Sequence, residues 1–122
     1  MQIKRINVNP RLSGAVVFGD QVFLSGQVPD KRDVDCASQT REVLAKIDTL
    51  LAAANSDNSR LLSEQIWLKD IHHDFTAMNE VWSAWLPDGC APARATLQAD
   101  LASSDVRVEI MVTAAVRDTS GR

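Results

Sequence analysis

The sequence has no tyrosine, only 5% aromatic residues and only two cysteines among its 122 positions. So few aromatic side chains provide no stacking platform for single-stranded nucleic acid. The formal net charge of −3 also provides no basic face for a phosphate backbone. No apolar run approaches the ~20 residues that a membrane-spanning helix needs. These absences argue against nucleic acid and against a membrane as partners.

Cys36 and Cys90 are too few for a disulfide framework and have no CxxC spacing. We therefore expect two free thiols. The first residues, MQIKRINVNP, lack the apolar segment of a secretory leader, so we expect a cytoplasmic protein. His72, His73 and Asp74 are consecutive, and neighbouring side chains point in different directions. We therefore expect neither a metal site nor a cofactor, and we interpret Asp74 as the N-cap of the following helix.

The chain shows no repeat, low-complexity tract or internal linker, which predicts one domain over 1–117 and a polar C-terminal tail over 118–122. Apolar runs and period-two alternation predict strands at 3–8, 15–18, 21–28, 62–69, 94–101 and 106–116. Apolar stripes at helical period predict a helix that begins after Asp33 or Asp35 and ends near Ala54. A second helix is predicted from about Phe75 to Leu86. The order predicts an α+β domain with both helices on one side of the sheet.

One face of this sheet has an unusual composition. We place Arg94, Thr96 and Glu109 on the face away from the helices, together with Phe23 and Met111. Such a face is too apolar for solvent and too polar for a closed core. We therefore expect it to be covered by other copies of the chain in a homo-oligomer.

No GxSxG, P-loop, GxGxxG or HExxH motif is present, which argues against the corresponding hydrolase, nucleotide and zinc-protease sites. What stands out is Arg94 in the segment APARAT and Glu109 in the segment VEI, fifteen positions later. Burying either charge without a partner costs several kcal/mol. Judged from the spacing alone, a salt bridge within or between subunits is as good an interpretation as a binding site.

Four segments resemble the Rid family, also called the YjgF or reactive intermediate deaminase family, in order and spacing. They are SGQVP at 25–29, DF and MN within 74–79, PARAT at 92–96 and VEI at 108–110. The similarity covers about residues 3–116, and the chain looks most like the YoaB-like branch. This resemblance implies a chorismate-mutase-like fold with a six-stranded mixed sheet and two helices on one face. It also implies a homotrimer with clefts between the subunits.

The same resemblance implies that the chain hydrolyses reactive 2-imino acids and enamines, of the 2-iminobutanoate and 2-iminopropanoate type, to 2-oxo acids and ammonia. Arg94 would bind the substrate carboxylate through two hydrogen bonds. Glu109 would hold the water that adds to the C=N carbon. The other expected substrate contacts are Thr96, Ser25, Gly26 and Trp82.

Two positions depart from the family's pattern. Many deaminase members have Cys where this chain has Thr96, and many have an early Tyr that closes the cleft. Phe18 or Trp82 could fill the space of the missing Tyr. Two alternatives stay open: a non-catalytic trimeric sensor that binds small carboxylates such as 2-oxo acids at Arg94, and a protein-interaction module in which the cleft is incidental.

Overall fold

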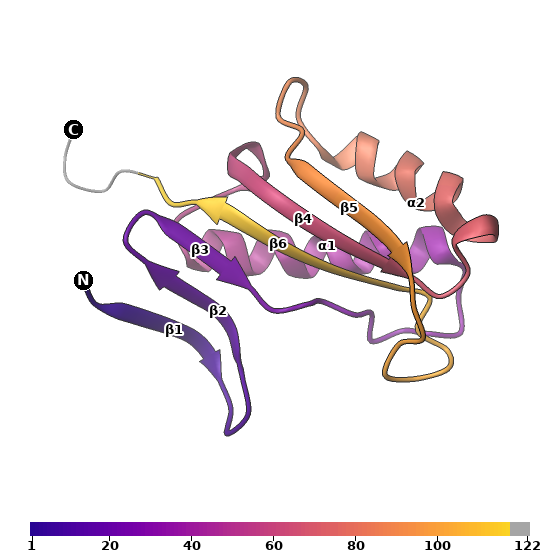
Figure 1. The fold of residues 1–122 in the computed structure, drawn as a ribbon, viewed down its shortest axis with the longest axis horizontal. Coiled ribbons are helices and arrows are strands. Elements are labelled where there is room, and N and C mark those ends of the chain that lie inside the picture. Colours follow the sequence, from indigo (N-terminus) through magenta and orange to yellow (C-terminus); the bar gives the residue numbers. More distant parts are fainter. Residues whose placement is uncertain (118–122) are drawn as a thin grey trace.

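Six strands form one mixed sheet in the order β1-β2-β3-β6-β4-β5, and both helices lie on one side of it (Figure 1). The strands are β1 (Ile3–Val8), β2 (Ser13–Phe18), β3 (Gln21–Leu24), β4 (Leu61–Leu68), β5 (Ala93–Gln98) and β6 (Val108–Ala115). The helices are α1 (Cys36–Ala53) and α2 (Ile71–Trp85), with a short 3-10 helix, η1 (Asn58–Arg60), before β4. The computed structural model describes residues 1–117, so the tail expected at 118–122 lies outside the described residues. The predicted α+β fold and element order are confirmed.

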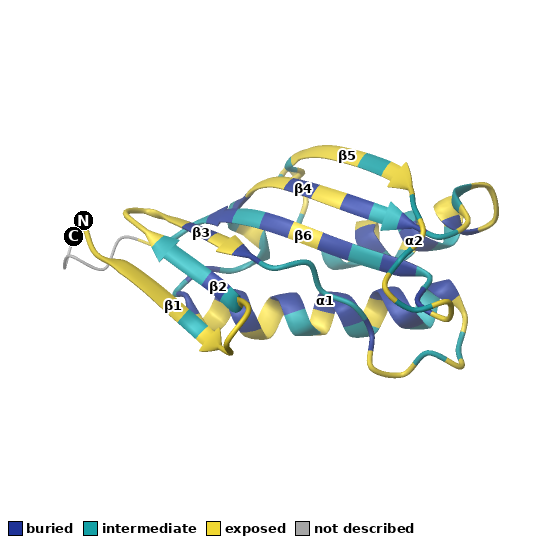
Figure 2. Cartoon of the chain, turned by 60° about the horizontal axis from the view of Figure 1, so that its bottom comes forward, coloured by how far each residue is buried: buried dark blue, intermediate teal, exposed yellow. Residues whose placement is uncertain are grey.

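The last strand of the chain occupies the centre of the sheet. β1, β2 and β3 form an antiparallel meander, and β6 pairs antiparallel with both β3 and β4. β5 pairs parallel with β4, after a crossover through α2. The edges of the sheet are therefore β1 and β5, which are also its most exposed strands (Figure 2).

Helix α1 begins where the sequence predicts. The side chain of Asp35 accepts a hydrogen bond from the Ser38 amide at 2.9 Å, which identifies Asp35 rather than Asp33 as the N-cap. The predicted apolar stripe of the helix packs against the sheet, with Val43 and Ile47 fully buried. Burial of each such side chain stabilises the fold by roughly 1.5–3 kcal/mol.

Helix α2 begins earlier than its apolar stripe suggests. Asp70 is the N-cap and accepts from the His73 amide, so the interpretation of Asp74 as the cap is wrong. Asp74 lies in the first turn, is 2% exposed and accepts a hydrogen bond from Arg107 Nε at 2.9 Å. Its Oδ2 also forms an ion pair with Arg107 Nη2 at 2.8 Å. Asp74 thus binds Arg107, 33 positions away in the chain, instead of capping the helix locally. Among residues 1–117, neither this helix nor any other is long and apolar enough to cross a membrane.

The prediction that Arg94 and Thr96 lie on the sheet face away from the helices is wrong. In the parallel register of β4 and β5, Arg94 is opposite Glu64 and Thr96 is opposite Ile66. Glu64 and Ile66 are buried on the helix side of β4, so their neighbours face the helices too. Because β5 is an edge strand exposed on both faces, its alternation of small apolar and polar residues does not show which face meets the core.

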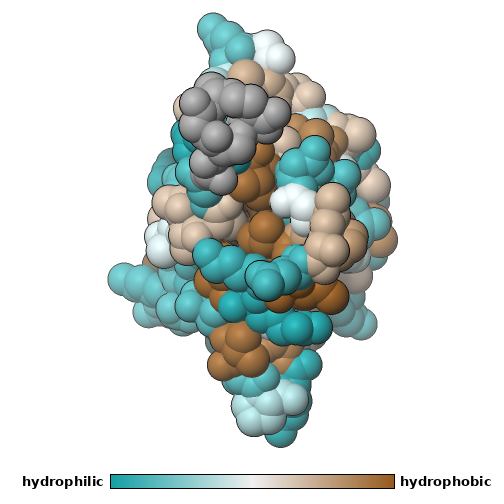
Figure 3. All heavy atoms as spheres, turned by 90° about the vertical axis from the view of Figure 1, so that its left-hand side faces the viewer, coloured by the Kyte–Doolittle hydropathy of each residue, from teal (hydrophilic) through white to brown (hydrophobic). Residues whose placement is uncertain are grey.

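The face away from the helices does carry exposed apolar side chains. The cross-strand register places five of them there, each at least 37% exposed: Ile3, Phe18, Phe23, Leu97 and Met111. Figure 3 views the molecule from the left-hand side of Figure 1, where apolar surface lies between polar residues. An exposed apolar set of this kind is typical of a surface that associates with another protein chain.

Candidate functional site

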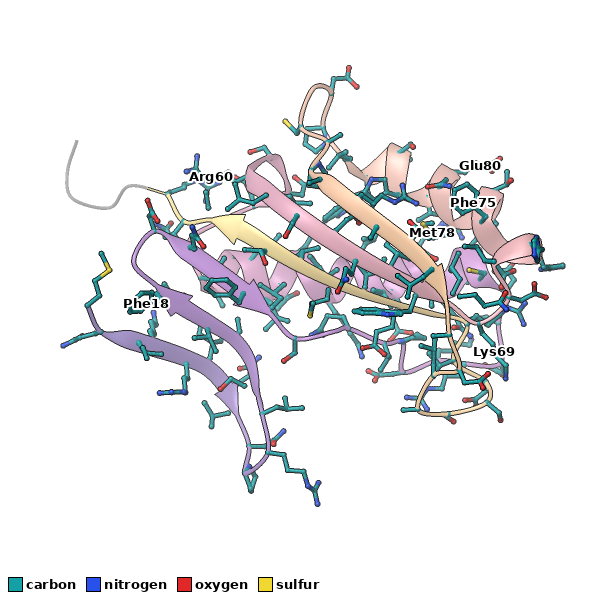
Figure 4. All side chains as sticks on the ribbon, viewed as in Figure 1. Phe18, Arg60, Lys69, Phe75, Met78 and Glu80 are labelled. Carbon is teal, nitrogen blue, oxygen red and sulfur yellow. The ribbon has the colours of Figure 1, made fainter. Side chains whose placement is uncertain are left out.

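Arg94 projects from β5 toward helix α2. Its Nε donates a hydrogen bond to Thr96 Oγ1 at 2.8 Å, and its Nη2 lies 3.8 Å from the Met78 sulfur. The guanidinium carbon lies 5.9 Å from the centre of the Phe75 ring, within the range of a cation–π contact. Figure 4 labels Phe75 and Met78 on α2. The guanidinium is thus held between the edge strand and the helix.

A buried carboxyl group lies beside this guanidinium. Glu64 is directly opposite Arg94 in the register, with Oε1 3.6 Å from Arg94 Nε. The Glu64 side chain is fully buried, and neither of its oxygens has a hydrogen-bond partner among the described residues. Burial raises the pKa of Glu64 to about 8, and the positive charge of Arg94 only partly offsets that rise. At neutral pH the carboxyl is therefore mostly protonated and leaves the charge of Arg94 uncompensated.

The sequence interpretation missed Glu64. Its position has the same parity on β4 as Ile66 and Leu68, which are both fully buried. A charged residue on the apolar face of a predicted strand was the signal that could have identified it.

Arg94 keeps hydrogen-bonding capacity for a ligand. An arginine has five N–H donors. Within the described part of the chain, its hydrogen bonds use Nε toward Thr96 and one Nη2 hydrogen toward the weak acceptor sulfur of Met78. The remaining donors suit the two oxygens of a carboxylate. The Arg94 cluster, made of Arg94, Thr96, Glu64, Phe75 and Met78, is therefore a candidate site for a small organic acid.

A second cluster lies on the opposite face and contains Glu109, Ser25 and Gly26. A Cβ atom at position 26 would lie 2.1 Å from Glu109 Oε2, so the carboxylate occupies the space that only glycine leaves free. The segment is fixed by two backbone hydrogen bonds between Gln27 and Ile110 and by Ser25 Oγ, which donates to the Ser13 carbonyl at 2.5 Å. Burial raises the pKa of Glu109, which makes it a stronger base than an exposed glutamate.

The structure brings Arg94 together with Thr96, and Glu109 together with Ser25 and Gly26, but it keeps these two groups apart. Glu109 pairs with Trp67 on β4, three positions from the Glu64 that pairs with Arg94. Three residues of a strand span roughly 10 Å, and two strand spacings add a comparable offset. The side chains also project from opposite faces. One small acid therefore cannot contact Arg94 and Glu109 of the same protomer.

The remaining expected contact, Trp82, lies in the core. It is 4% exposed, and its ring centre is 5.2 Å from that of Trp85. Trp82 therefore offers almost no surface to a ligand in this protomer. Phe18, the other candidate for the place of the missing Tyr, is 47% exposed on the Glu109 side of the sheet.

Two other sets of potentially reactive side chains, Cys36 and the Asp74–His73 pair, have structural rather than catalytic surroundings. Cys36 is buried, and burial raises the pKa of its thiol to about 11, which leaves it protonated and poorly nucleophilic at neutral pH. Asp74 is held by Arg107, and His73 Nδ1 lies 2.7 Å from Asp74 Oδ1. Cys36 and Cys90 are both free thiols. Over 1–117, no three His, Cys, Asp or Glu residues are grouped to hold a metal ion.

Known proteins resemble the chain over nearly its whole length. The sequence model of the family described as Endoribonuclease L-PSP matches residues 2–116. The RutC family protein YoaB of Escherichia coli K12 is 40% identical over 116 residues, which cover 95% of this chain and 100% of that protein. A RutC family protein of Haemophilus ducreyi is 39% identical over 114 residues, which cover 93% of this chain and 97% of that protein.

The fold is similar to that of a solved relative. A crystal structure of a YjgF-family protein from Neisseria meningitidis superposes with a TM-score of 0.93 at 44% sequence identity, and the match covers 98% of each chain. The six-stranded mixed sheet with two helices on one face is common to both.

Proposed function

We propose, since this chain belongs to the Endoribonuclease L-PSP family and to its YjgF and RutC relatives, that it hydrolyses 2-imino acids to 2-oxo acids and ammonia. The family resemblance read from the sequence, including the YoaB-like branch, is confirmed. Family membership points to hydrolytic activity, and the imino acid substrate is our assignment. The observation that supports it best is the Arg94 guanidinium, which has donors left for a carboxylate and a neighbouring carboxyl that is mostly neutral at pH 7.

We propose that the protein acts as a homotrimer. The two clusters could form the two halves of one active site. Arg94 lies at a sheet edge, whereas Glu109 lies on a sheet face whose exposed apolar side chains suit contact with another protomer. If the β5 edge of one protomer packs near the Glu109 face of the next, both halves meet. A head-to-tail contact of this kind closes into a ring when the rotation is suitable. Three such contacts would give three identical clefts.

In each cleft Arg94 would bind the carboxylate and thereby fix the position of the adjacent C=N bond. Glu109 of the adjoining protomer would accept a proton from a water molecule as its oxygen adds to the imine carbon. Return of that proton to the imine nitrogen gives the neutral carbinolamine. Transfer of the hydroxyl proton to the amino group, with Glu109 as the carrier, then lets the C–N bond break, so that ammonia leaves and the 2-oxo acid forms. General-base assistance of this kind typically accelerates a reaction by about 10²–10⁴-fold.

The experiment that tests the reaction uses an amino-acid oxidase to generate the imine and semicarbazide to trap it. Addition of the protein should speed the loss of imine and decrease the trapped product. Arg94→Ala should abolish this effect, because the substrate is no longer held. An unchanged rate of imine loss with the wild-type protein would refute the proposed reaction.

A second candidate function is a sensor that binds small carboxylates without turnover. It is favoured by one observation: the Arg94 cluster is complete on its own face and does not include Glu109. Glu109→Ala separates the two functions. For an enzyme, this substitution should abolish imine turnover and leave most of the affinity for 2-oxobutanoate; equal loss of both would contradict the role of Glu109 in holding water.

A further inference from the structure

Among the described residues, Glu64 alone has buried side-chain oxygens that lack a hydrogen-bond partner. Its neighbour in the register is Arg94, and the 3.6 Å between Oε1 and Nε is an ion-pair contact but too long for a hydrogen bond. Buried carboxyl groups are normally hydrogen-bonded, because burial of a lone polar group is unfavourable. Neither the proposed reaction nor the packing of the core accounts for an acid at this position.

We propose that Glu64 is a positioning residue that sets the affinity of Arg94 for a carboxylate ligand. When Glu64 is protonated, the guanidinium keeps its full charge for the ligand. When Glu64 is ionised, it neutralises Arg94 from behind and competes with the ligand. The inference rests on the proposed function only in that Arg94 binds a small organic acid.

Arg94 is the charged group that acts on Glu64. Opposite Glu64 on β6 is Val112, and Glu109 of the same strand lies on the other face of the sheet. Helix α2 presents Met78 and Phe75 to the guanidinium. The other titratable or charged groups of the two helices are Cys36, Arg41, Glu42, Lys46, Asp48, His72, His73, Asp74 and Glu80. None of them contributes to the shift of the Glu64 pKa.

Several of these helix groups have partners elsewhere. Asp48 accepts a hydrogen bond from Trp85, and Lys46 donates to Asp30. Asp74 is engaged by Arg107. Burial and the charge of Arg94 are the influences on the pKa of Glu64 within the described protomer, so the charge that Arg94 offers to a ligand depends chiefly on the protonation of Glu64.

The expected direction of the pH dependence follows from linkage. A carboxylate bound to Arg94 favours the protonated form of Glu64 and so raises its pKa above the value of about 8 in the free protein. Ligand binding near pH 8 is then accompanied by uptake of a proton. Affinity should be constant well below pH 8 and should fall as the pH rises above it.

The test measures binding of 2-oxobutanoate by calorimetry from pH 6.5 to 9.5, with the full chain in its native oligomeric state. For the wild type we expect affinity to fall about tenfold between pH 8 and pH 9.5, with proton uptake seen as a dependence of the heat on the buffer. Glu64→Gln keeps the shape and removes the titration, so its affinity should not change with pH. Glu80→Gln makes the same change of charge at an exposed position of α2 and should behave like the wild type.

A pH-independent wild-type affinity, or the same decline in Glu64→Gln, would overturn the inference. If Glu64→Gln does not fold, the wild-type measurement in two buffers at pH 8 still decides, because absence of proton uptake refutes the linkage. Turnover of imine is assayed separately. Proton-linked binding without turnover would refute the proposed reaction and support this inference, while turnover with pH-independent binding would do the reverse. No binding at any pH would overturn both.

Discussion

The backbone of Gly26 lies against the carboxylate of Glu109, at a distance where a Cβ atom would be 2.1 Å from Oε2. The far end of a flexible side chain can move, so a methyl group at position 26 should displace the carboxylate and leave the fold intact. The glycine thus fixes the position of the proposed base.

For Gly26→Ala we expect imine turnover to fall by at least about 10²-fold, as when a general base is displaced. The free energy of unfolding should change by less than about 1 kcal/mol, since the clash is relieved by rotation of one side chain. Turnover and urea unfolding measured on the same preparation check both statements. Full activity in Gly26→Ala would show that the position of the Glu109 carboxylate is unimportant.

Thr96→Val should weaken carboxylate binding by roughly fivefold. The substitution keeps the shape of the side chain but removes the acceptor for Arg94 Nε, a hydrogen bond worth about 1 kcal/mol. Thr96→Ser retains the hydroxyl and should bind 2-oxobutanoate like the wild type. Equal affinities of the Val and Ser variants would mean that the hydroxyl does not hold the guanidinium.

Glu64 should make stability depend on pH. Burial raises its folded-state pKa from 4.5 to about 8, so the folded state binds a proton that the unfolded state has lost between these values. The free energy of unfolding should therefore decrease by up to about 4 kcal/mol as the pH rises from 4.5 to 8. Urea unfolding at pH 5 and pH 8.5 measures this, and Glu64→Gln should lose less stability over that interval. An equal loss in both proteins would locate the effect in another group.

Arg107→Ala should destabilise the protein by about 2–3 kcal/mol. It leaves Asp74 buried with His73 as its remaining side-chain partner, and broken buried ion pairs typically cost about 3–5 kcal/mol. We expect a smaller loss of stability than this typical range because the Arg107 side chain is itself a third exposed. Arg32→Ala is the control: its 3.8 Å contact with Asp105 is more exposed and should contribute less than about 1 kcal/mol. Similar unfolding midpoints for the two variants would contradict the structural role of Asp74.

The elements that the sequence predicted well are those with a strong local signal. Helix α1 has a long apolar stripe and a cap, Asp35, three positions before the amide that donates to it. Its presence could therefore be predicted and its start narrowed to Asp33 or Asp35. Asp74 was misinterpreted because its partner, Arg107, is distant in the chain. A local capping pattern cannot reveal such a pair.

The division of the site between two faces could not be predicted for a similar reason. The side-chain period of a strand tells which residues share a face, but not which face meets the helices when the strand lies at an exposed edge. On β5 the small Ala93 and Ala95 face away from the helices, while Arg94 and Thr96 face toward them. The place of β6 between β3 and β4 also depends on pairing between distant segments.

Because Arg94 and Glu109 lie apart within one protomer, the proposed reaction requires a cleft shared by two protomers. Subunit mixing tests this requirement most directly. Arg94→Ala and Glu109→Ala proteins, each inactive alone, are mixed in equal amounts, dissociated and reassembled, and imine loss is followed by semicarbazide trapping. In random assembly about one cleft in four combines an intact Arg94 edge with an intact Glu109 face, so about a quarter of wild-type activity should return. Each variant reassembled alone should stay inactive. A mixture no more active than its components would show that the two side chains do not act across a subunit boundary.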